Sequence, residues 1–330
     1  MTKKIDKQSY ESILSPIRDD MQRVEQYLLQ NLETDIPLLR EVSQYILKAG
    51  GKRFRPALLL FAAAATGKID DKACQAAAVI EYIHTATLLH DDVVDNADLR
   101  RSKKAARSIW GNEASVLVGD YLFTVSFQYL ADLEDPELIK ILSRATTTMA
   151  RGEIIQLERD NRTATEGDYL KIIEYKTASL LGTAMGLGAK IAGASTSERD
   201  LLYQCGINMG MAFQMIDDAL DYAIIEAKTG KDIGTDLKER KITLPLSHLI
   251  DRAEGSDKTV VSDILDKDLI TDEHVRQVHE LMNRYGSIQY TQNQAEQYAE
   301  KAKENVAGLS NSVYKTGIMQ LADFIISRKA

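Results

Sequence analysis

The scarcity of proline is the feature that most constrains the fold of this chain of 330 residues. The five prolines stand at positions 16, 37, 56, 136 and 245, which leaves residues 57–135, 137–244 and 246–330 without a proline to end a helix. Apolar residues recur at steps of three and four, as in Met209, Phe213 and Ile216, and no segment shows sustained alternation of strand type. The sequence therefore predicts an all-α protein with long helices.

Capping residues predict where several of these helices begin and end. Asp135 before Pro136 is typical of an N-cap followed by proline in the first turn. Ser197 with Asp200 resembles a capping pair and predicts a second helix start. The Gly-Ser pair at 286–287 predicts the end of one helix and the start of the next.

Composition and charge exclude several classes of protein. With 44% hydrophobic and 27% charged residues and no linker-like stretch, we expect a soluble protein with one domain over residues 1–330. The net charge of -8 argues against nucleic acid as a partner. Cys74 and Cys205 lie in apolar helical patterns, which fits packing roles in a reducing cytoplasm. No apolar run predicts a signal peptide or a transmembrane segment.

Two clusters of acidic residues are the strongest chemical signal. Both follow the pattern Asp-Asp-x-x-Asp on an apolar helix, and they comprise Asp91, Asp92 and Asp95, and Asp217, Asp218 and Asp221. The first and last acids of each cluster are four residues apart, so they share one helix face about a turn from each other. Carboxylates placed in this way repel each other unless a cation lies between them. The clusters therefore predict a cation-binding site.

The type of ligand favours magnesium at these clusters. A single such motif is more often a solvated helix end, but two copies in similar apolar contexts favour a metal site. Oxygen ligands suit Mg²⁺, which is typically held by one or two carboxylates with phosphate and water completing its shell. Zinc is disfavoured because His274 and His279 are five residues apart rather than four, and neither cysteine has a ligand-like neighbour.

Basic residues that could bind a polyanion accompany the acidic clusters. Three cations, Lys52, Arg53 and Arg55, stand between the glycines at 50–51 and Pro56, in a loop that enters a helix. Backbone amides at a helix start together with basic side chains suit an anion, although such residues are often merely solvated. Further cations near the two clusters are Arg100, Arg101, Lys176, Lys231 and Lys241.

Two other features have both a functional and an ordinary interpretation. His84 lies seven residues before Asp91, two helical turns away on the same face, which favours a hydrogen bond to substrate over a packing role. The segment 229–237, which contains Lys231 between two glycines, could close over a substrate or be a polar surface loop.

Taken together, these motifs give the chain a family resemblance. It resembles the trans-polyprenyl diphosphate synthases, close to the bacterial octaprenyl diphosphate synthases. The resemblance covers nearly the whole chain and depends on five segments in the family's order and spacing: Gly-Gly-Lys-Arg-x-Arg-Pro at 50–56, Ile-His-Thr-Ala-Thr-Leu-Leu-His-Asp-Asp-Val-Val-Asp at 83–95, Val-Leu-Val-Gly-Asp at 116–120, Tyr-Lys-Thr at 175–177, and Phe-Gln-x-x-Asp-Asp at 213–218. It implies an antiparallel helical bundle around a deep central cavity, and a homodimer.

The resemblance also implies a role for each motif residue. Magnesium, about two or three ions with substrate bound, would be held by Asp91, Asp95 and Asp217, with Asp92, Asp218 and Asp221 assisting. Isopentenyl diphosphate would be held by Gly51, Lys52, Arg55, His84 and Arg101. The allylic diphosphate would be contacted by Arg100, Lys176, Thr177, Gln214 and Lys231, and the six aspartates with Lys176 would make up the catalytic set.

Chain length is expected to depend on the residues just below the first cluster. In the short-chain enzymes of the family, bulky aromatic residues at the positions of Ala86 and Thr87 block the passage for the growing chain. The small residues at these positions therefore imply a long, octaprenyl-like product, in keeping with quinone side chains. Two alternatives stay open. A terpene cyclase should lack the cations for isopentenyl diphosphate and usually contains more aromatic residues, and a non-catalytic isoprenoid-binding subunit tends to lose its acidic motifs.

Overall fold

The computed structural model describes residues 7–30, 34–48, 51–100, 103–159, 163, 165–223, 234–241 and 243–328. Two positions of the expected site, Arg101 and Lys231, lie outside these described residues. Within them, nearly all regular structure is helical, and the strands are limited to the two-residue antiparallel pair β1 (Leu99–Arg100) and β2 (Lys103–Lys104). The all-α class expected from the proline spacing is confirmed.

The helices of the N-terminal half are connected by short segments. They are α1 (Lys7–Ile13), the 3-10 turn η1 (Ser15–Ile17), α2 (Arg18–Gln30), α3 (Pro37–Lys48), α4 (Phe54–Thr66), α5 (Asp71–Val94), α6 (Ala106–Ala131) and α7 (Pro136–Glu158). The longest of these, α5 and α6, pack against each other over much of their length. The acidic cluster at 91–95 is therefore at the end of a long, well-supported helix.

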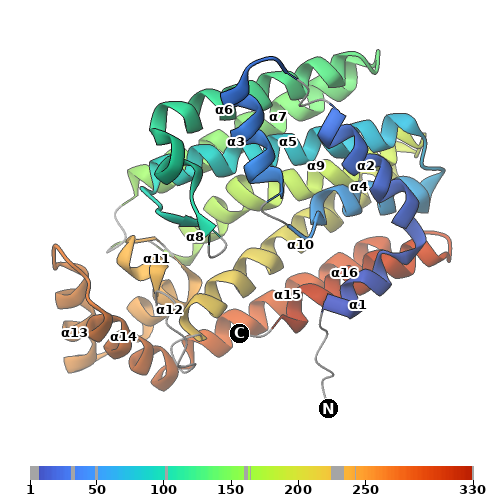
Figure 1. Ribbon diagram of the computed structural model, residues 1–330. Coiled ribbons are helices and arrows are strands. Elements are labelled where there is room, and N and C mark those ends of the chain that lie inside the picture. Colours follow the sequence, from blue (N-terminus) through green and yellow to red (C-terminus); the bar gives the residue numbers. More distant parts are fainter. Residues whose placement is uncertain are drawn as a thin grey trace.

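The C-terminal half contains one further long helix, α10, among mostly shorter ones. Its elements are α8 (Glu166–Ile173), the π-helical turn η2 (Glu174–Ala178), α9 (Ser179–Ile191), α10 (Thr196–Ala223), α11 (Thr235–Lys238), α12 (Leu244–Arg252), α13 (Gly255–Leu265), α14 (Asp272–Arg284), α15 (Ser287–Val306) and α16 (Val313–Ser327). In Figure 1, α9 and α10 lie between the α3, α5, α6 and α7 side of the molecule and the α15 and α16 side.

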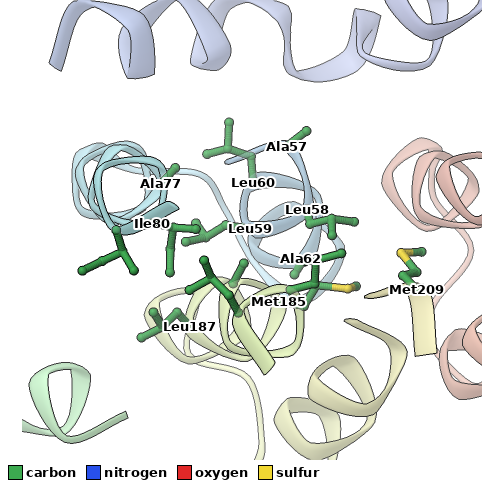
Figure 2. Close-up of a cluster of buried hydrophobic side chains, with 14 of the residues drawn as sticks. Ala57, Leu58, Leu59, Leu60, Ala62, Ala77, Ile80, Met185, Leu187 and Met209 are labelled. Atoms are coloured by element: carbon green, nitrogen blue, oxygen red, sulfur yellow. The ribbon is translucent and has the colours of Figure 1, made fainter. Parts of the chain in front are cut away.

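The main core lies where α4, α5, α9 and α10 meet. Figure 2 shows Leu58 and Leu59 of α4 with Ile80 of α5 and Met185 of α9, all of which are fully buried. After Arg55 in its first turn, α4 is apolar around its whole circumference up to Ala65, so it is stable only when neighbours surround it. Gly188 of α9 allows the closest approach, because a Cβ at this position would lie 2.1 Å from the Leu59 carbonyl oxygen.

A second cluster of buried apolar residues lies at one end of the molecule. It is formed by α11 to α14, which Figure 1 shows grouped together, and it includes Leu249, Val275 and Met282. α12 of this group contacts α10 and α15 of the main bundle. The single domain expected for residues 1–330 stays a prediction.

The helix ends show which capping signals were interpreted correctly. Asp135 accepts a hydrogen bond from the Glu137 amide at the start of α7, and the glycine at 286, with φ 67°, separates α14 from α15, as predicted. The start predicted at Ser197 is wrong, because α10 begins at residue 196. Ser195 makes the cap: its hydroxyl accepts from the Glu198 amide, and the Glu198 carboxylate accepts from the Ser195 amide.

Two further expectations concern the cysteines and the membrane. Cys74 and Cys205 are both fully buried and are not joined in a disulfide, in agreement with packing roles. No helix within the described ranges combines the length and the apolar character that a bilayer crossing requires.

Candidate active site

The first acidic cluster sits at the C-terminal end of α5. Asp92 is fully buried, and its Oδ1 accepts a hydrogen bond from Arg100 Nε at 2.5 Å. Asp91 lines a cavity, and Asp95, directly after the helix, contacts Lys241 Nζ through Oδ2 at 2.8 Å. Asp92 therefore holds the Arg100 side chain in place, while Asp91 faces the cavity and Asp95 pairs with Lys241.

The second cluster, near the C-terminal end of α10, repeats this division. Asp218 is buried, and its two oxygens accept hydrogen bonds from Gln214 Nε2 at 2.8 Å and from the Tyr169 hydroxyl at 2.7 Å. Gln214 in turn accepts a hydrogen bond from the Thr177 hydroxyl at 3.0 Å. Asp218 thus orients Gln214 and Thr177, two residues that the sequence assigned to the allylic diphosphate.

Asp217 is surrounded by cations. Burial raises the pKa of Asp217, whereas Arg328, Lys52 and Arg55 lower it. Arg328 Nη1 lies 2.6 Å from Asp217 Oδ1, and the guanidinium lies 4.7 Å from the ring centroid of Phe213. Arg328 was not among the predicted site residues. It follows an apolar helix directly, and no local pattern separates a basic residue in that place from a solvated basic residue.

Lys241 connects the two acidic clusters. Its Nζ contacts Asp95 Oδ2, 146 residues away in sequence, and also Glu239 Oε2 at 2.7 Å. Asp221 lies close enough that Lys241 lowers its pKa, against the larger effect of burial, which raises it. Asp221 Oδ2 also accepts a hydrogen bond from the Asp236 amide at 3.1 Å. The ends of α5 and α10, which carry the two clusters, are therefore held close together.

An apolar cavity of about 420 Å³ begins beside the first cluster. It lies between α5, α6, α7 and η2, and the residues that line it are Ile83, Thr87, His90, Asp91, Asp120, Phe123, Thr146, Met149, Ala150, Glu153, Ile154 and Lys176. Ile83 and Asp91 are eight residues apart on one helix, so the cavity extends roughly 12 Å along α5. Its size lies within the range of small-molecule sites.

Two acids and a lysine, Asp91, Glu153 and Lys176, form the charged end of this cavity. Lys176 Nζ lies 2.5 Å from Glu153 Oε2. Burial raises the pKa of Asp91 to about 6, and Lys176 opposes the rise while Glu153 adds to it. Glu153 was not among the predicted site residues, because it is one of three glutamates on α7 and belongs to no motif.

Lys176 and Thr177 are carried by the π-helical turn η2. Such turns are rare and are frequent at functional sites, because the extra residue redirects the side chains. Gly152 of α7 allows the turn to approach, since a Cβ there would lie 2.7 Å from the Lys176 amide nitrogen. The Tyr-Lys-Thr motif is thereby placed beside α7 and the cavity.

The glycine-rich loop departs from its prediction at one position. Lys52 and Arg55 lie near Asp217, and Lys52 Nζ also lies 4.5 Å from the ring centroid of Phe324. Arg53, predicted as a third cation for an anion, instead points into the protein and pairs with Glu25 and Glu81. The spacing of the three basic residues in the sequence could not reveal that their side chains point in different directions, because those directions depend on a turn of the backbone between adjacent residues.

The remaining predicted residues occupy a range of environments. Gly51 is exposed at the start of the loop, and His84 is half-buried on α5, outside the set that lines the cavity. Thr87 lines the cavity, whereas Ala86 is fully buried in the core cluster. The ligand and chain-length roles of all these residues stay predictions.

The oxygen-rich surroundings fit magnesium held jointly with a substrate. Among the residues that the structure describes, no three His, Cys, Asp or Glu side chains gather closely enough to hold a metal by themselves. Mg²⁺ needs only one or two carboxylates when phosphate and water complete its shell. A buried oxygen with no hydrogen-bond partner, Asp92 Oδ2, and the cavity-facing Asp91 are suitable donors for such an ion.

Comparison with known proteins agrees with this arrangement. The family model described as "Polyprenyl synthetase" matches residues 36–282. The octaprenyl diphosphate synthase of Haemophilus influenzae is 37% identical over 327 residues, covering 99% of each chain. The chain belongs to the polyprenyl synthetase family. The octaprenyl diphosphate synthase of Escherichia coli is also 37% identical, over 94% of this chain and 96% of that protein.

Solved structures of polyprenyl synthases share the fold. A polyprenyl synthase from Caulobacter crescentus, solved in complex with calcium and isoprenyl diphosphate, matches with a TM-score of 0.93 and 36% identity, covering 98% of each chain. The likeness spans both acidic clusters, the glycine-rich loop and the cavity, since it leaves almost none of the chain unmatched.

Asp218 should make the stability of the metal-free protein depend on pH. Burial raises the pKa of this carboxyl to about 7 from an ordinary 3.8, so the folded state binds a proton more tightly than the unfolded state. The free energy of unfolding should therefore fall as pH rises from about 4 to about 7, by an amount on the order of a few kcal/mol. Asp218→Asn should flatten this dependence in chemical denaturation without magnesium. An unchanged slope would show that Asp218 does not titrate in this range.

Proposed function

We propose that this protein is a magnesium-dependent prenyltransferase that condenses isopentenyl diphosphate with an allylic diphosphate and makes a long-chain, octaprenyl-like polyprenyl diphosphate. The observation that carries the proposal is that Lys241, which lies near Asp221 of the second acidic cluster, pairs with Asp95 of the first cluster, whose Asp91 lines an apolar cavity together with Lys176. Family membership and the octaprenyl diphosphate synthases among its relatives support it. A cytoplasmic enzyme that supplies quinone side chains is the setting we propose.

The two diphosphates would occupy different groups of cations. Isopentenyl diphosphate would bind near Asp217, where Lys52 and Arg55 already lie, with Gly51, His84 and Arg101 completing the site. The allylic diphosphate would bind near Asp91, with Arg100, Lys176, Thr177, Gln214 and Lys231 around it. Arg100 and Gln214 donate hydrogen bonds to the buried carboxylates of Asp92 and Asp218, which fixes both side chains in advance, so less conformational freedom is lost on binding.

The reaction needs no protein nucleophile. The allylic carbon–oxygen bond breaks, and diphosphate leaves with the electron pair. The π electrons of isopentenyl diphosphate then form a carbon–carbon bond to the allylic cation, which leaves a new cation on the isopentenyl unit. The adjacent carbon loses a proton to the diphosphate, and the electron pair of that carbon–hydrogen bond forms the new double bond. Magnesium, when bound, neutralises charge on the leaving group. Lys176 adds positive charge there, and the apolar walls at Ile83, Phe123 and Met149 exclude water from the cation.

A product assay tests the proposed function directly. Purified protein with magnesium, isopentenyl diphosphate and a short allylic diphosphate should give a polyprenyl diphosphate, whose mass reports the number of units added. Release of diphosphate with a cyclic hydrocarbon would instead indicate a terpene cyclase. Binding of both substrates without turnover would indicate a non-catalytic or partner-dependent subunit.

We also propose that the protein is a homodimer that pairs through α6 and α7. Five large apolar side chains are exposed on these helices, and one of them, Ile154, also lines the cavity: Ile109, Val116 and Leu117 on α6, and Ile154 and Leu157 on α7. Leu117 is 67% exposed and Leu157 64%, values that are unfavourable for a monomer in water. A second copy of the same face would cover them.

Disrupting this face should separate the dimer. Leu117→Glu would place a charge at the centre of the proposed contact, and we expect the mass by light scattering to fall by half at micromolar concentration. Leu269→Glu is the matched control, because Leu269 is 74% exposed between α13 and α14, away from α6. Equal masses for wild type and both variants would contradict the proposed interface.

A further inference from the structure

Arg53 differs from the two basic residues beside it in the glycine-rich loop. Its guanidinium is turned into the protein, where Nη1 donates to Glu81 Oε1 at 2.8 Å and Nε donates to Glu25 Oε1 at 2.6 Å. Nη2 also donates to the Leu47 carbonyl oxygen at 2.9 Å. One side chain thus connects the loop to α2, to α5 and to the end of α3.

The backbone of Arg53 is in the left-handed region, with φ 47° and ψ 41°. A residue with a long side chain adopts this conformation only when its surroundings compensate for the strain. The four hydrogen bonds of the guanidinium, to Glu25, Glu81 and the Leu47 carbonyl oxygen, provide that compensation. Glu81 is 5% exposed, so its pairing with Arg53 is also largely shielded from water.

The turn at Arg53 determines where its neighbours lie. Lys52, just before the turn, has its carbonyl oxygen bonded by the Tyr10 hydroxyl at 2.7 Å. Arg55, just after the turn, is in the first turn of α4, and both cations lie near Asp217. An ordinary helical or extended conformation at residue 53 would change the direction of the chain between them.

We infer that Arg53 is a positioning residue for the binding of isopentenyl diphosphate: it holds Lys52 and Arg55 in register by pairing with Glu81. The inference rests on the proposed function, which assigns those two cations to isopentenyl diphosphate. Glu81 lies ten residues before Asp91 on the same helix, about 15 Å along its axis. The Arg53–Glu81 pair therefore also fixes the loop relative to the helix that carries the first acidic cluster.

A double variant separates positioning from simple stability. Arg53→Met alone would leave the buried Glu81 charge unpaired and destabilise the fold. Arg53→Met with Glu81→Gln leaves no unpaired buried charge, so the midpoint of thermal unfolding should return toward the wild-type value. The KM for isopentenyl diphosphate should nevertheless rise about tenfold or more, because Lys52 and Arg55 are no longer held, while the KM for the allylic diphosphate should change by less than about twofold.

Two single variants complete the test. Arg53→Lys keeps the buried charge but cannot reach three acceptors at once, so it should fold and show an intermediate KM for isopentenyl diphosphate; it also serves if the double variant does not fold. Arg199→Met is the control, because it removes an arginine that forms a more exposed ion pair, with Glu137, at the other end of α10, roughly 27 Å along the helix from Asp217. Its KM values should equal those of wild type.

The possible outcomes distinguish this inference from the proposed function. If wild type does not consume isopentenyl diphosphate, the proposed function fails. If wild type elongates the chain but both Arg53 variants keep its KM, or if both KM values rise equally, Arg53 is structural only and the positioning role is wrong.

Discussion

Asp91→Ala and Asp217→Ala should each leave a folded protein whose turnover is lower by a factor of about a thousand or more. Each change removes a carboxylate that we propose binds magnesium, and the cations near it cannot replace the ion's charge on the leaving diphosphate. Neither position holds the core together, because Asp91 faces the cavity and Asp217 pairs with the side chain of Arg328. Steady-state kinetics with saturating substrates and magnesium, alongside circular dichroism, would measure the effect.

An acid outside the site provides the control for this experiment. Asp263 is exposed on α13, and Asp263→Ala removes the same group without affecting the clusters. We expect this variant to keep wild-type turnover. Near-normal rates in Asp91→Ala or Asp217→Ala would refute the metal assignment, even if the fold and the family are correct.

Thr87→Phe should shorten the product by several isoprene units. Thr87 lines the cavity one helical turn from Asp91, so a phenyl ring there would block the passage along which the growing chain extends. Ala86→Phe should act in the same direction but with a loss of stability, because Ala86 is fully buried among core residues. Mass spectrometry of the products and thermal unfolding would measure both effects.

Thr147→Phe is the matched control for this change. Thr147 lies on the exposed side of α7, next to Thr146, which lines the cavity. The same substitution there should leave the product length unchanged. If Thr87→Phe and Thr147→Phe both give the wild-type product, the chain does not pass along α5.

The fold class and both acidic clusters could be predicted from local sequence. Proline spacing and apolar periodicity depend on neighbouring residues alone, and the spacing of Asp91 and Asp95 fixes them on one helix face whatever the rest of the chain does. The N-cap of α10 was harder to predict, since three hydroxyl residues stand in a row at 195–197. The glutamate three residues after Ser195 decided which of them caps α10.

Contacts between distant segments could not be predicted in this way. Lys241 reaches Asp95 across 146 residues, and Arg328 reaches Asp217 from the end of α16, and neither pairing leaves a pattern in the sequence. Residue type could not separate Arg53 from Lys52 and Arg55 for a related reason: all three are basic, and only the left-handed backbone at Arg53 turns its side chain in a different direction. Site chemistry was therefore predictable by residue type, whereas the pairing among charges required the tertiary structure.

The burial of both thiols makes this enzyme convenient for fluorescence labelling. Cys74 and Cys205 have no exposed surface, and burial raises the pKa of Cys74 to about 12, so neither should react readily with maleimides at neutral pH. A cysteine introduced at exposed Lys103, in the hairpin after the first acidic cluster, should then carry a dye at a single site. Such a dye would report substrate arrival in real time without removal of the native cysteines.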